Sequence, residues 1–478
     1  MQRGWTIAPE PHNTLKTPKL HATCPRSCID YRLTANLKTT LQYSNKTAAS
    51  PLTTSAGPAN AKPLAAASRL AEFCGLSQED QDVLSGQKAF PLEIAEHLIE
   101  NVVGIFQMPL GVASHFKIDG REVFIPMAVE ETSIVAAASA TAKWVKQNGL
   151  IRTYTRGKLI IGQIQLPSVR EVSRARNILH ENRELLIGYA NACLPGLVDR
   201  GGGVQDIAIR ELARPGESAS MLVLHLLCDP CDAMGANLIN QVCEALKPKI
   251  EELTLEKVGL CILSNLTDGK LAGAEVIIRN IDPVIGRGIQ EATLFAKCDP
   301  YRAATHNKGV LNGIDPILIA TGNDWRASEA GVHAFAARSG KYQPVTDWRI
   351  EGPDLIGKIE VPLAVGTVGG VTRVHPTARV ALKILGVTKA EELARICAAV
   401  GLVQNLGALR ALSTVGIVKG HMQLHAANLA IAAGAEIHEI PAVRARLSQV
   451  LKTEKRINLS HAREILESIR GETNDLLM

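Results

Sequence analysis

The spacing of apolar residues changes at residue 63. From there to residue 98 they recur at helical intervals, with Leu70, Phe73 and Leu76 preceding Ser77, a residue type that often begins a helix. We predict several helices in this stretch and the start of an ordered domain at residue 63. Residues 1–62 are rich in Ser, Thr, Lys and Pro and lack periodicity, so we predict a disordered extension, with a transit peptide as the alternative.

The pattern beyond residue 120 predicts alternating strands and helices. Residues 123–128 read as a strand, and the Ala- and Ser-rich segment 133–146 as a helix suited to close packing. Beyond Gly149 the chain has short β-branched runs, at 159–164, 207–209, 221–227 and 274–279. We therefore expect an inserted α/β subdomain that closes near Leu263, and a helix-rich region from about Gly416.

Length and charge narrow the class of protein. A chain of 478 residues is long enough for two or more domains. Its net charge is +5, but residues 1–62 carry eight basic and two acidic residues, which leaves −1 for the remainder. Aromatic residues make up only 4%. A basic, aromatic nucleic-acid surface is therefore not expected.

The apolar runs and the cysteines of the sequence indicate the cellular compartment of the protein and whether it holds a metal. No uninterrupted apolar stretch reaches the roughly 18 residues of a membrane span, and no secretory signal is visible. Ten scattered cysteines favour reduced thiols, so we expect a cytoplasmic protein without a membrane anchor. Cys228 and Cys231 form a CxxC, but no second pair matches it, and we expect no metal, with zinc as the alternative.

The first segment with candidate chemistry is Asp232-Ala233-Met234-Gly235-Ala236-Asn237. The helix expected after it has apolar residues at four-residue spacing, from Leu238 to Ile250. A turn of small residues before a helix exposes backbone N–H groups to a phosphate, as in dinucleotide sites, although no GxGxxG fingerprint is present. The alternative is a tight turn with Asp232 as the N-cap.

A second segment runs from Asp299 to Arg326 and is dense in polar side chains. Arg302 could clamp a substrate carboxylate, and a lysine beside Asp324 could stabilise an oxyanion formed by hydride addition. A solvated loop is the alternative.

Two shorter segments carry acid–base candidates. Glu130 and Glu131 directly precede the predicted helix at 133–146. If they are buried, their carboxyl groups could act as proton donors. The alternative is an ordinary charged helix start. His421 and His425 are four residues apart and would share a helix face. That spacing also suits a metal, but no third ligand is evident, so a general acid is the better functional interpretation.

Taken together, these segments resemble the class II 3-hydroxy-3-methylglutaryl-coenzyme A (HMG-CoA) reductases, in the same order along the chain. The match extends from about Ser68 to Arg470 and includes further segments at 100–104, 126–138, 201–203 and 366–370. The resemblance implies an oxidoreductase that interconverts HMG-CoA and mevalonate plus coenzyme A by two hydride transfers. It also implies a catalytic quartet: Glu131, Lys308, Asp324 and His421.

The resemblance assigns roles to these and other residues. Lys308 stabilises the oxyanion, Asp324 fixes Lys308, Glu131 supplies a proton to the aldehyde, and His421 protonates the departing thiolate. The implied substrate contacts are Ser133, Arg302 and Asn312 for the HMG portion and Glu100 and Asn101 for coenzyme A. The implied cofactor contacts are Asp232, Met234, Gly235, Ala236 and Asn237.

The choice between NADH and NADPH stays open. Members selective for NAD can have an aspartate after the segment that here reads Ala190 to Pro195, and none stands here. The lack of that aspartate removes an obstacle to the 2′-phosphate of NADP. A second departure is Ala427, where the family often has arginine.

The resemblance also implies an α+β multidomain fold. A large helical HMG-CoA-binding domain (63–155 and 265–413) holds an inserted small ferredoxin-like dinucleotide-binding domain (156–264), and a C-terminal helical flap (414–478) carries His421. Homodimers, or higher assemblies of dimers, are implied. The alternatives are a catalytically silent acyl-CoA-binding homologue and a dehydrogenase of another acyl-CoA.

Overall fold

The computed structural model describes residues 63–88, 90–414, 416, 426–454 and 456–475. The predicted extension at 1–62 and both histidines of the segment at 420–428 lie outside these residues.

Three short helices begin the described chain, as the apolar spacing predicts. They are α1 (Pro63–Cys74), α2 (Gln78–Ser85) and α3 (Leu92–Leu98). Ser77 caps α2, because its hydroxyl accepts a hydrogen bond from the backbone N–H of Asp80, whose side chain accepts one from the Ser77 N–H. The Phe73 ring packs edge-on against Phe124, with centroids 4.9 Å apart.

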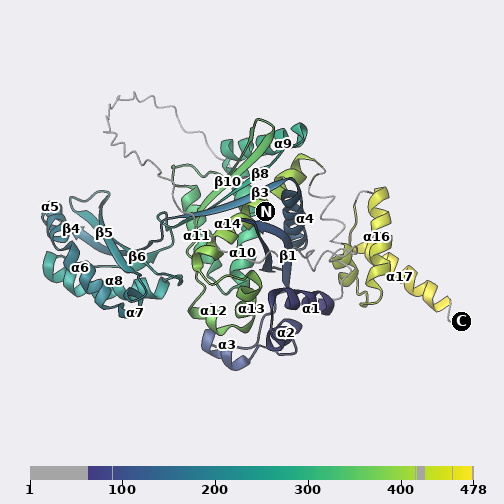
Figure 1. The fold of residues 1–478 in the computed structure, drawn as a ribbon, viewed down its shortest axis with the longest axis horizontal. Helices are drawn as coiled ribbons and strands as arrows, with labels where there is room; N and C mark the ends of the chain where they lie inside the picture. The colour runs from purple at the N-terminus through teal and green to yellow at the C-terminus, as the bar shows by residue number, and fades with distance from the viewer. Residues whose placement is uncertain (1–62, 89, 415, 417–425, 455, 476–478) are drawn as a thin grey trace, which may run out of the picture. The chain divides into compact units, whose positions relative to one another are not determined.

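A six-stranded sheet forms the centre of the first core (Figure 1). Its strand order is β2-β1-β3-β8-β10-β9, and every neighbouring pair is antiparallel except β1 and β3. The strands are β1 (Leu110–Ile118), β2 (Arg121–Ala128), β3 (Gly149–Arg156), β8 (Leu271–Ile278), β9 (Thr346–Glu351) and β10 (Asp354–Pro362). The strands predicted at 123–128 and 274–279 are confirmed as β2 and β8.

Helices pack around this sheet and bury its apolar side chains. They are α4 (Ile134–Asn148), α9 (Pro283–Cys298), α10 (Pro300–Ala320), α11 (Trp325–Ala336), α12 (Gly370–Val374), α13 (Pro376–Leu385) and α14 (Ala390–Ser413). Figure 1 shows α14 alongside α10, and it also packs on α9, α4 and β8. By length and composition α14 could cross a membrane, but 67% of its apolar window is buried inside the protein, as in a core helix.

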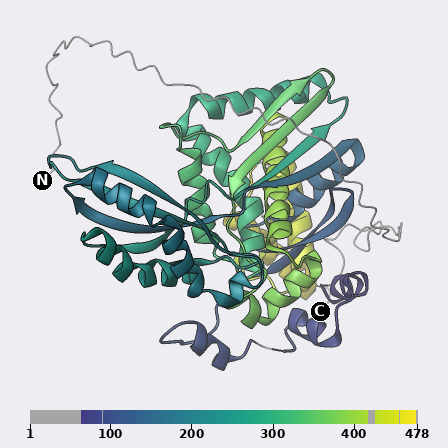
Figure 2. The same cartoon turned by 60° about the vertical axis from the view of Figure 1, so that its left-hand side comes forward.

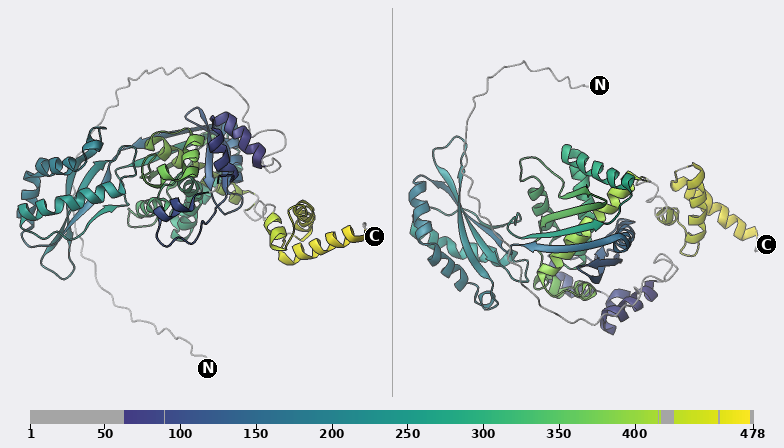
Figure 3. Two further views of the ribbon diagram at one scale, coloured as in Figure 1. Left: turned by 90° about the horizontal axis from the view of Figure 1, so that it is seen from below. Right: turned by 45° about the horizontal axis from the view of Figure 1, so that its top comes forward.

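A second, four-stranded antiparallel sheet has its own apolar core. Its strands are β4 (Ile160–Val169), β5 (Gly203–Ala213), β6 (Ser220–Asp229) and β7 (Cys261–Ser264). The helices are α5 (Val172–Glu181), α6 (Arg183–Ala192), α7 (Pro195–Val198) and α8 (Ala236–Thr254). Figures 2 and 3 show the helices against one face of this sheet. The spatial order β5-β6-β4-β7, with helices after β4 and β6, is the predicted ferredoxin-like arrangement.

The last part of the chain is helical, as predicted. Residues 426–432 form a helix and are followed by α16 (Ile440–Glu454) and α17 (Leu459–Asp475). They share an apolar cluster that includes Ala426, Val443 and Leu466. The described chain is thus an α+β protein, as the sequence predicts.

Candidate active site

The polar segment from Asp299 to Arg326 forms two consecutive helices. The Asp299 carboxylate accepts hydrogen bonds from the N–H groups of Tyr301 and Arg302, and Pro300 occupies the first turn of α10. The solvated-loop alternative is therefore wrong, because a cap and a proline start a helix that is buried along much of its length. Lys308 and Asn312 are four residues apart and lie on one face of this helix.

Lys308 is paired with Glu131 across 177 positions of sequence. Its Nζ lies 2.9 Å from the Glu131 Oε2 atom, and the two side chains are 61% and 41% exposed. Glu131 lies in the turn between β2 and α4, and Ser133, which precedes α4, has a left-handed backbone with φ of 74°. Two of the predicted catalytic residues are thus in direct contact and reachable from solvent.

Asp324 begins α11 and has a capping role. Its Oδ1 atom accepts a hydrogen bond of 3.0 Å from the N–H of Ala327 and lies 3.4 Å from the Nε of Arg326. Within the described ranges, no ion pair joins it to Lys308. The structure therefore pairs the lysine with Glu131 rather than with the expected aspartate, whose carboxylate is engaged by its own helix.

Arg302 carries a positive charge in the first turn of α10. Its side chain is half-buried, and burial lowers the pKa of its guanidinium. No carboxylate among the residues that the structure describes forms an ion pair with it. The neighbouring His306 is buried, and burial together with the Arg302 charge lowers the pKa of that imidazole to about 4. A half-buried guanidinium that has no carboxylate partner in the described ranges is a strong binding group for a substrate carboxylate.

A buried polar network fixes α10 below these residues. His306 Nε2 lies 2.5 Å from the Thr346 hydroxyl, which donates a hydrogen bond to Asn405 Oδ1. The indole N–H of Trp348 donates to the same oxygen. The network joins α10, β9 and α14, so it holds the helix that carries Lys308 in one position.

The turn at 232–237 leads directly into α8. Gly235 precedes the helix with φ of 95°, a backbone conformation that favours glycine, and no side chain of the described residues caps the helix. The alternative of Asp232 as N-cap is wrong, since its Oδ1 atom accepts a hydrogen bond from the N–H of Ala390 at 2.9 Å. The first N–H groups of α8 therefore have no capping side chain, as an anion site requires.

A second loop, at 366–370, lies against this turn. A Cβ atom on Gly366 would stand 2.7 Å from the backbone nitrogen of Met234, so the backbones touch only because residue 366 is glycine. Thr367 donates its N–H to the carbonyl of Asp232. Asn323 exchanges two hydrogen bonds with the Gly366 backbone, of 2.7 and 3.1 Å. The glycine loop thus links the turn at 232–237 to the residue before Asp324, and sequence reasoning did not single out Asn323 for that role.

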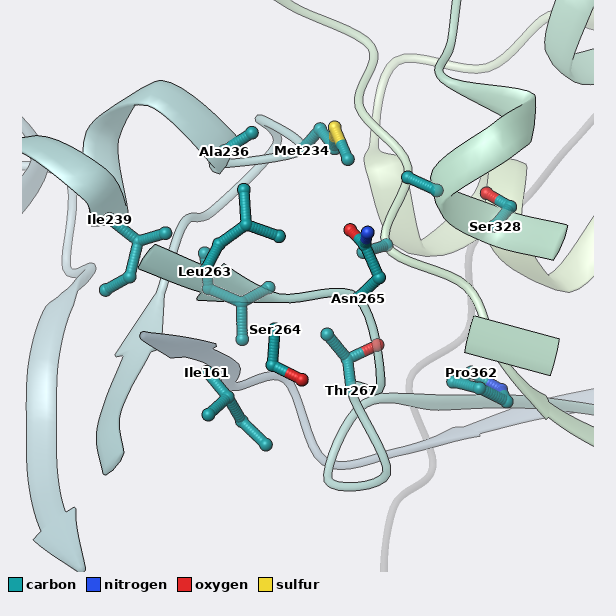
Figure 4. A pocket seen from close by; sticks show the side chains of 13 residues that line it. Ile161, Met234, Ala236, Ile239, Leu263, Ser264, Asn265, Thr267, Ser328 and Pro362 are labelled. Carbon is teal, nitrogen blue, oxygen red and sulfur yellow. The ribbon is translucent and has the colours of Figure 1, made fainter. Parts of the chain in front are cut away.

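A small pocket opens beside the turn (Figure 4). Figure 4 shows Ala236 and Leu263 on one side of it and Ser328 and Pro362 on another. The residues that line it come from α8, α11, the ends of strands in both sheets and the loops next to them.

Other predicted site residues lie apart from this constellation. Glu100 and Asn101 follow α3 and are exposed, with a left-handed backbone at Asn101. His421 lies outside the described residues. Burial raises the pKa of the Cys228 thiol to about 12, which makes it unreactive. In the described part of the chain, no group of three or more His, Cys, Asp or Glu residues is arranged to hold a metal ion.

The site combines the Lys308–Glu131 pair, an arginine that has no carboxylate partner among the described residues, and a helix start that can receive a phosphate. Such groups suit an enzyme that binds an acidic substrate together with a dinucleotide. Comparison with known proteins makes this specific. The sequence model of hydroxymethylglutaryl-coenzyme A reductase matches residues 65–426, and the chain belongs to that family, in its class II branch.

Relatives and solved structures agree with this assignment. A 3-hydroxy-3-methylglutaryl-coenzyme A reductase of Archaeoglobus fulgidus is 46% identical over 409 residues, which is 84% of this chain and 92% of that protein. A probable reductase of Borreliella burgdorferi is 34% identical over 69% of this chain and 76% of its own length. The Streptococcus pneumoniae reductase matches with a TM-score of 0.72 and 37% identity, over 86% of this chain and 98% of that chain. The predicted family, fold and enzyme class are confirmed.

Proposed function

We propose that this protein interconverts HMG-CoA and mevalonate plus coenzyme A. In the reductive direction the thioester and two protons accept two hydrides from two molecules of NADH or NADPH, and the products are the primary alcohol and the free thiol. The observation that carries this proposal is the solvent-accessible pair of Lys308 and Glu131. Each hydride addition to a carbonyl creates negative charge on oxygen, which a positioned ammonium stabilises.

We propose distinct tasks for the catalytic residues. Lys308 donates a hydrogen bond to the oxyanion, and Glu131, 2.9 Å away, supplies the proton that completes the alcohol. Asp324, at the start of α11, orients the cationic groups around it. His421, outside the described residues, protonates the departing coenzyme A thiolate, which leaves more readily as the thiol.

The proposed contacts with the HMG portion centre on the guanidinium of Arg302. Arg302 binds the free carboxylate of the HMG portion by a bidentate pair, and Ser133 and Asn312 contribute polar contacts beside Glu131 and Lys308. Glu100 and Asn101 contact coenzyme A. The segment after α3 is exposed, so it is accessible to the coenzyme A part of the substrate.

The proposed cofactor site is the turn at 232–237 with the start of α8. Its backbone N–H groups face a phosphate, and Gly235 provides the close approach. The nicotinamide nucleotide bound there supplies the hydride. The S. pneumoniae reductase has been solved bound to NADPH, and Ala190 to Pro195 places no aspartate against a 2′-phosphate. We propose that both NADH and NADPH are accepted.

The domain division and assembly are also proposals. We place the HMG-CoA-binding domain at 63–155 and 265–413, the dinucleotide-binding domain at 156–264 and the flap at 414–478. A homodimer, or an assembly of dimers, is supported by Val103 and Phe106, whose side chains are almost fully exposed in the segment after α3. We propose that the enzyme works in the cytoplasm.

The test is HMG-CoA-dependent oxidation of NADH and of NADPH with mevalonate quantified. The Lys308→Ala variant should lose on the order of 10²–10³ in kcat, as for removal of one preorganised donor. Lys297→Ala is the matched control, because Lys297 pairs with Asp347 elsewhere and its loss should leave kcat unchanged. Folded wild-type protein that forms no mevalonate, or undiminished turnover in Lys308→Ala, would contradict the proposal.

A further inference from the structure

The carboxylate of Asp229 lies directly before the turn at 232–237, and both of its oxygen atoms have partners. Asp229 is the last residue of β6, and its side chain is only 10% exposed. Its Oδ2 atom lies 2.6 Å from the Nζ of Lys158. Its Oδ1 atom accepts a hydrogen bond of 2.9 Å from the backbone N–H of Cys231. Asp229 therefore connects a lysine outside the turn with the backbone that leads into it.

Lys158 belongs to the linker between the two sheets. This linker, residues 157–159, joins β3 of the six-stranded sheet to β4 of the four-stranded sheet. The antiparallel register of β4 and β6 pairs Ile160 with Cys228, so the residues just before Ile160 lie beside those just after Cys228. Strand pairing thus brings Lys158 to Asp229.

The backbone next to Asp229 has an uncommon conformation. Cys231 has φ of 52°, in the left-handed region that costs energy for a residue with a Cβ atom. The hydrogen bond from its N–H to the side chain two residues earlier closes an Asx turn, which stabilises the bend. Cys231 directly precedes the turn at 232–237, so its conformation sets the direction in which the chain enters α8.

Burial makes the Asp229 carboxylate depend on its partners. An ion pair between two exposed side chains contributes little, because water competes with each partner. Asp229 is instead largely removed from water, where a charged oxygen requires a donor. Lys158 provides one, and the hydrogen bond to Asp229 raises the pKa of its ammonium group. Without Lys158 the Oδ2 atom loses this donor, and the carboxylate gains solvation by turning toward water and away from Cys231.

We propose that Lys158 and Asp229 are positioning residues for the nicotinamide cofactor. They hold Cys231, and with it the turn at 232–237, in the conformation in which the first N–H groups of α8 can receive a phosphate. A turn that is ordered before binding spares the cofactor the free-energy cost of ordering it. This inference rests on the proposed cofactor site and extends it to a linker residue and to the strand end before the turn.

The first test measures binding and needs no turnover. Dissociation constants of NADPH and NADH are measured by fluorescence for the wild type and Lys158→Met, which removes the charge and keeps most of the side-chain length. Both constants should rise about tenfold, because both nucleotides carry the same pyrophosphate and lose the same ordered turn. Lys158→Arg keeps the charge and the hydrogen bond and should bind within about threefold of the wild type. Lys249→Met is the matched control, because Lys249 pairs with Glu252 about 20 Å along α8 from the turn, and it should bind as the wild type does.

The second test separates positioning from a general loss of structure. In steady-state kinetics Lys158→Met should raise KM for both nucleotides about tenfold and change KM for HMG-CoA by less than about twofold, because the contacts proposed for HMG-CoA lie elsewhere. Asp229→Asn should also weaken nucleotide binding. The double variant of Lys158→Met with Asp229→Asn should bind no worse than Asp229→Asn alone, since the two groups act as one unit. If Asp229→Asn does not fold, the Lys158 variants carry the test.

The outcomes are distinguishable. Wild-type dissociation constants in Lys158→Met, a loss that Lys158→Arg does not restore, or an equal loss in Lys249→Met overturns the positioning role. Folded wild-type protein that binds NADPH but forms no mevalonate contradicts the proposed function and leaves the binding test intact. Wild-type protein that binds neither nucleotide overturns both.

Discussion

The buried network under α10 predicts a large loss of stability when one atom is removed. Asn405 Oδ1 accepts two hydrogen bonds, of 3.0 Å from the Thr346 hydroxyl and 2.9 Å from the Trp348 indole N–H. All three side chains are at most 2% exposed. Asn405→Ala therefore leaves two buried donors without an acceptor.

The magnitude follows from counting those donors. Each unsatisfied buried donor costs about 1–3 kcal/mol, so the free energy of unfolding should fall by about 2–6 kcal/mol. The total for a folded domain is about 5–15 kcal/mol, so the loss is a large share of it. Thr346→Ser keeps the hydroxyl and should cost less than about 1.5 kcal/mol.

Denaturant-induced unfolding of the wild type and both variants measures these losses. Because the network also anchors the helix that carries Lys308, Asn405→Ala should lower kcat at temperatures where the protein is still folded. A loss below about 1 kcal/mol in Asn405→Ala would mean that water or another group satisfies both donors, which contradicts a stabilising role of Asn405.

Three further outcomes are expected. Arg302→Met should raise KM for HMG-CoA by about 10–100-fold, because a charged hydrogen bond contributes about 1.5–3 kcal/mol, and should leave KM for the nicotinamide cofactor unchanged. Steady-state kinetics with each substrate varied measures the two KM values. An equal rise in both KM values would contradict the prediction. Gly366→Ala places a Cβ 2.7 Å from the Met234 backbone nitrogen, so the turn at 232–237 must shift. Dinucleotide binding, followed by fluorescence, should therefore weaken at least tenfold. Unchanged binding would show that the contact between Gly366 and this turn is not required for the cofactor. The pKa of His306 in the folded protein, about 4, lies below its usual value of 6.5. The neutral imidazole therefore contributes to the free energy of unfolding above pH 6.5, and this contribution is lost as the pH falls toward 4, at up to about 1.4 kcal/mol per pH unit. Unfolding measured against pH should show this slope in the wild type and a shallower one in His306→Gln.

The sequence predicted the elements whose signals are local. Ser77 begins a helix, the apolar run at 123–128 is a strand, and the apolar spacing after residue 236 is a helix face buried against the four-stranded sheet. Each of these patterns depends only on neighbours a few residues away, which is why sequence alone was sufficient.

Features set by distant residues could not be predicted from spacing. The segment that forms helix α10 was ambiguous because its many polar side chains are typical of a loop as well as of a site. Its burial depends on α14, about 90 residues later in the sequence. The bond between Lys308 and Glu131 spans 177 positions. The capping duty of Asp324 and the role of Asn323 in binding Gly366 emerge only when the loops come together. The proposed catalytic residues come from the family resemblance, not from periodicity.

We propose that this chain reduces HMG-CoA through Lys308. The most direct measurement is the amount of mevalonate formed per HMG-CoA consumed, with NADH and with NADPH, by wild type, Lys308→Ala and Lys297→Ala. We expect one mevalonate and two oxidised cofactors per HMG-CoA in the wild type and in Lys297→Ala, and a loss on the order of 10²–10³ in rate in Lys308→Ala. Folded wild-type protein that oxidises one cofactor or none per thioester, or Lys308→Ala with wild-type turnover, would contradict it.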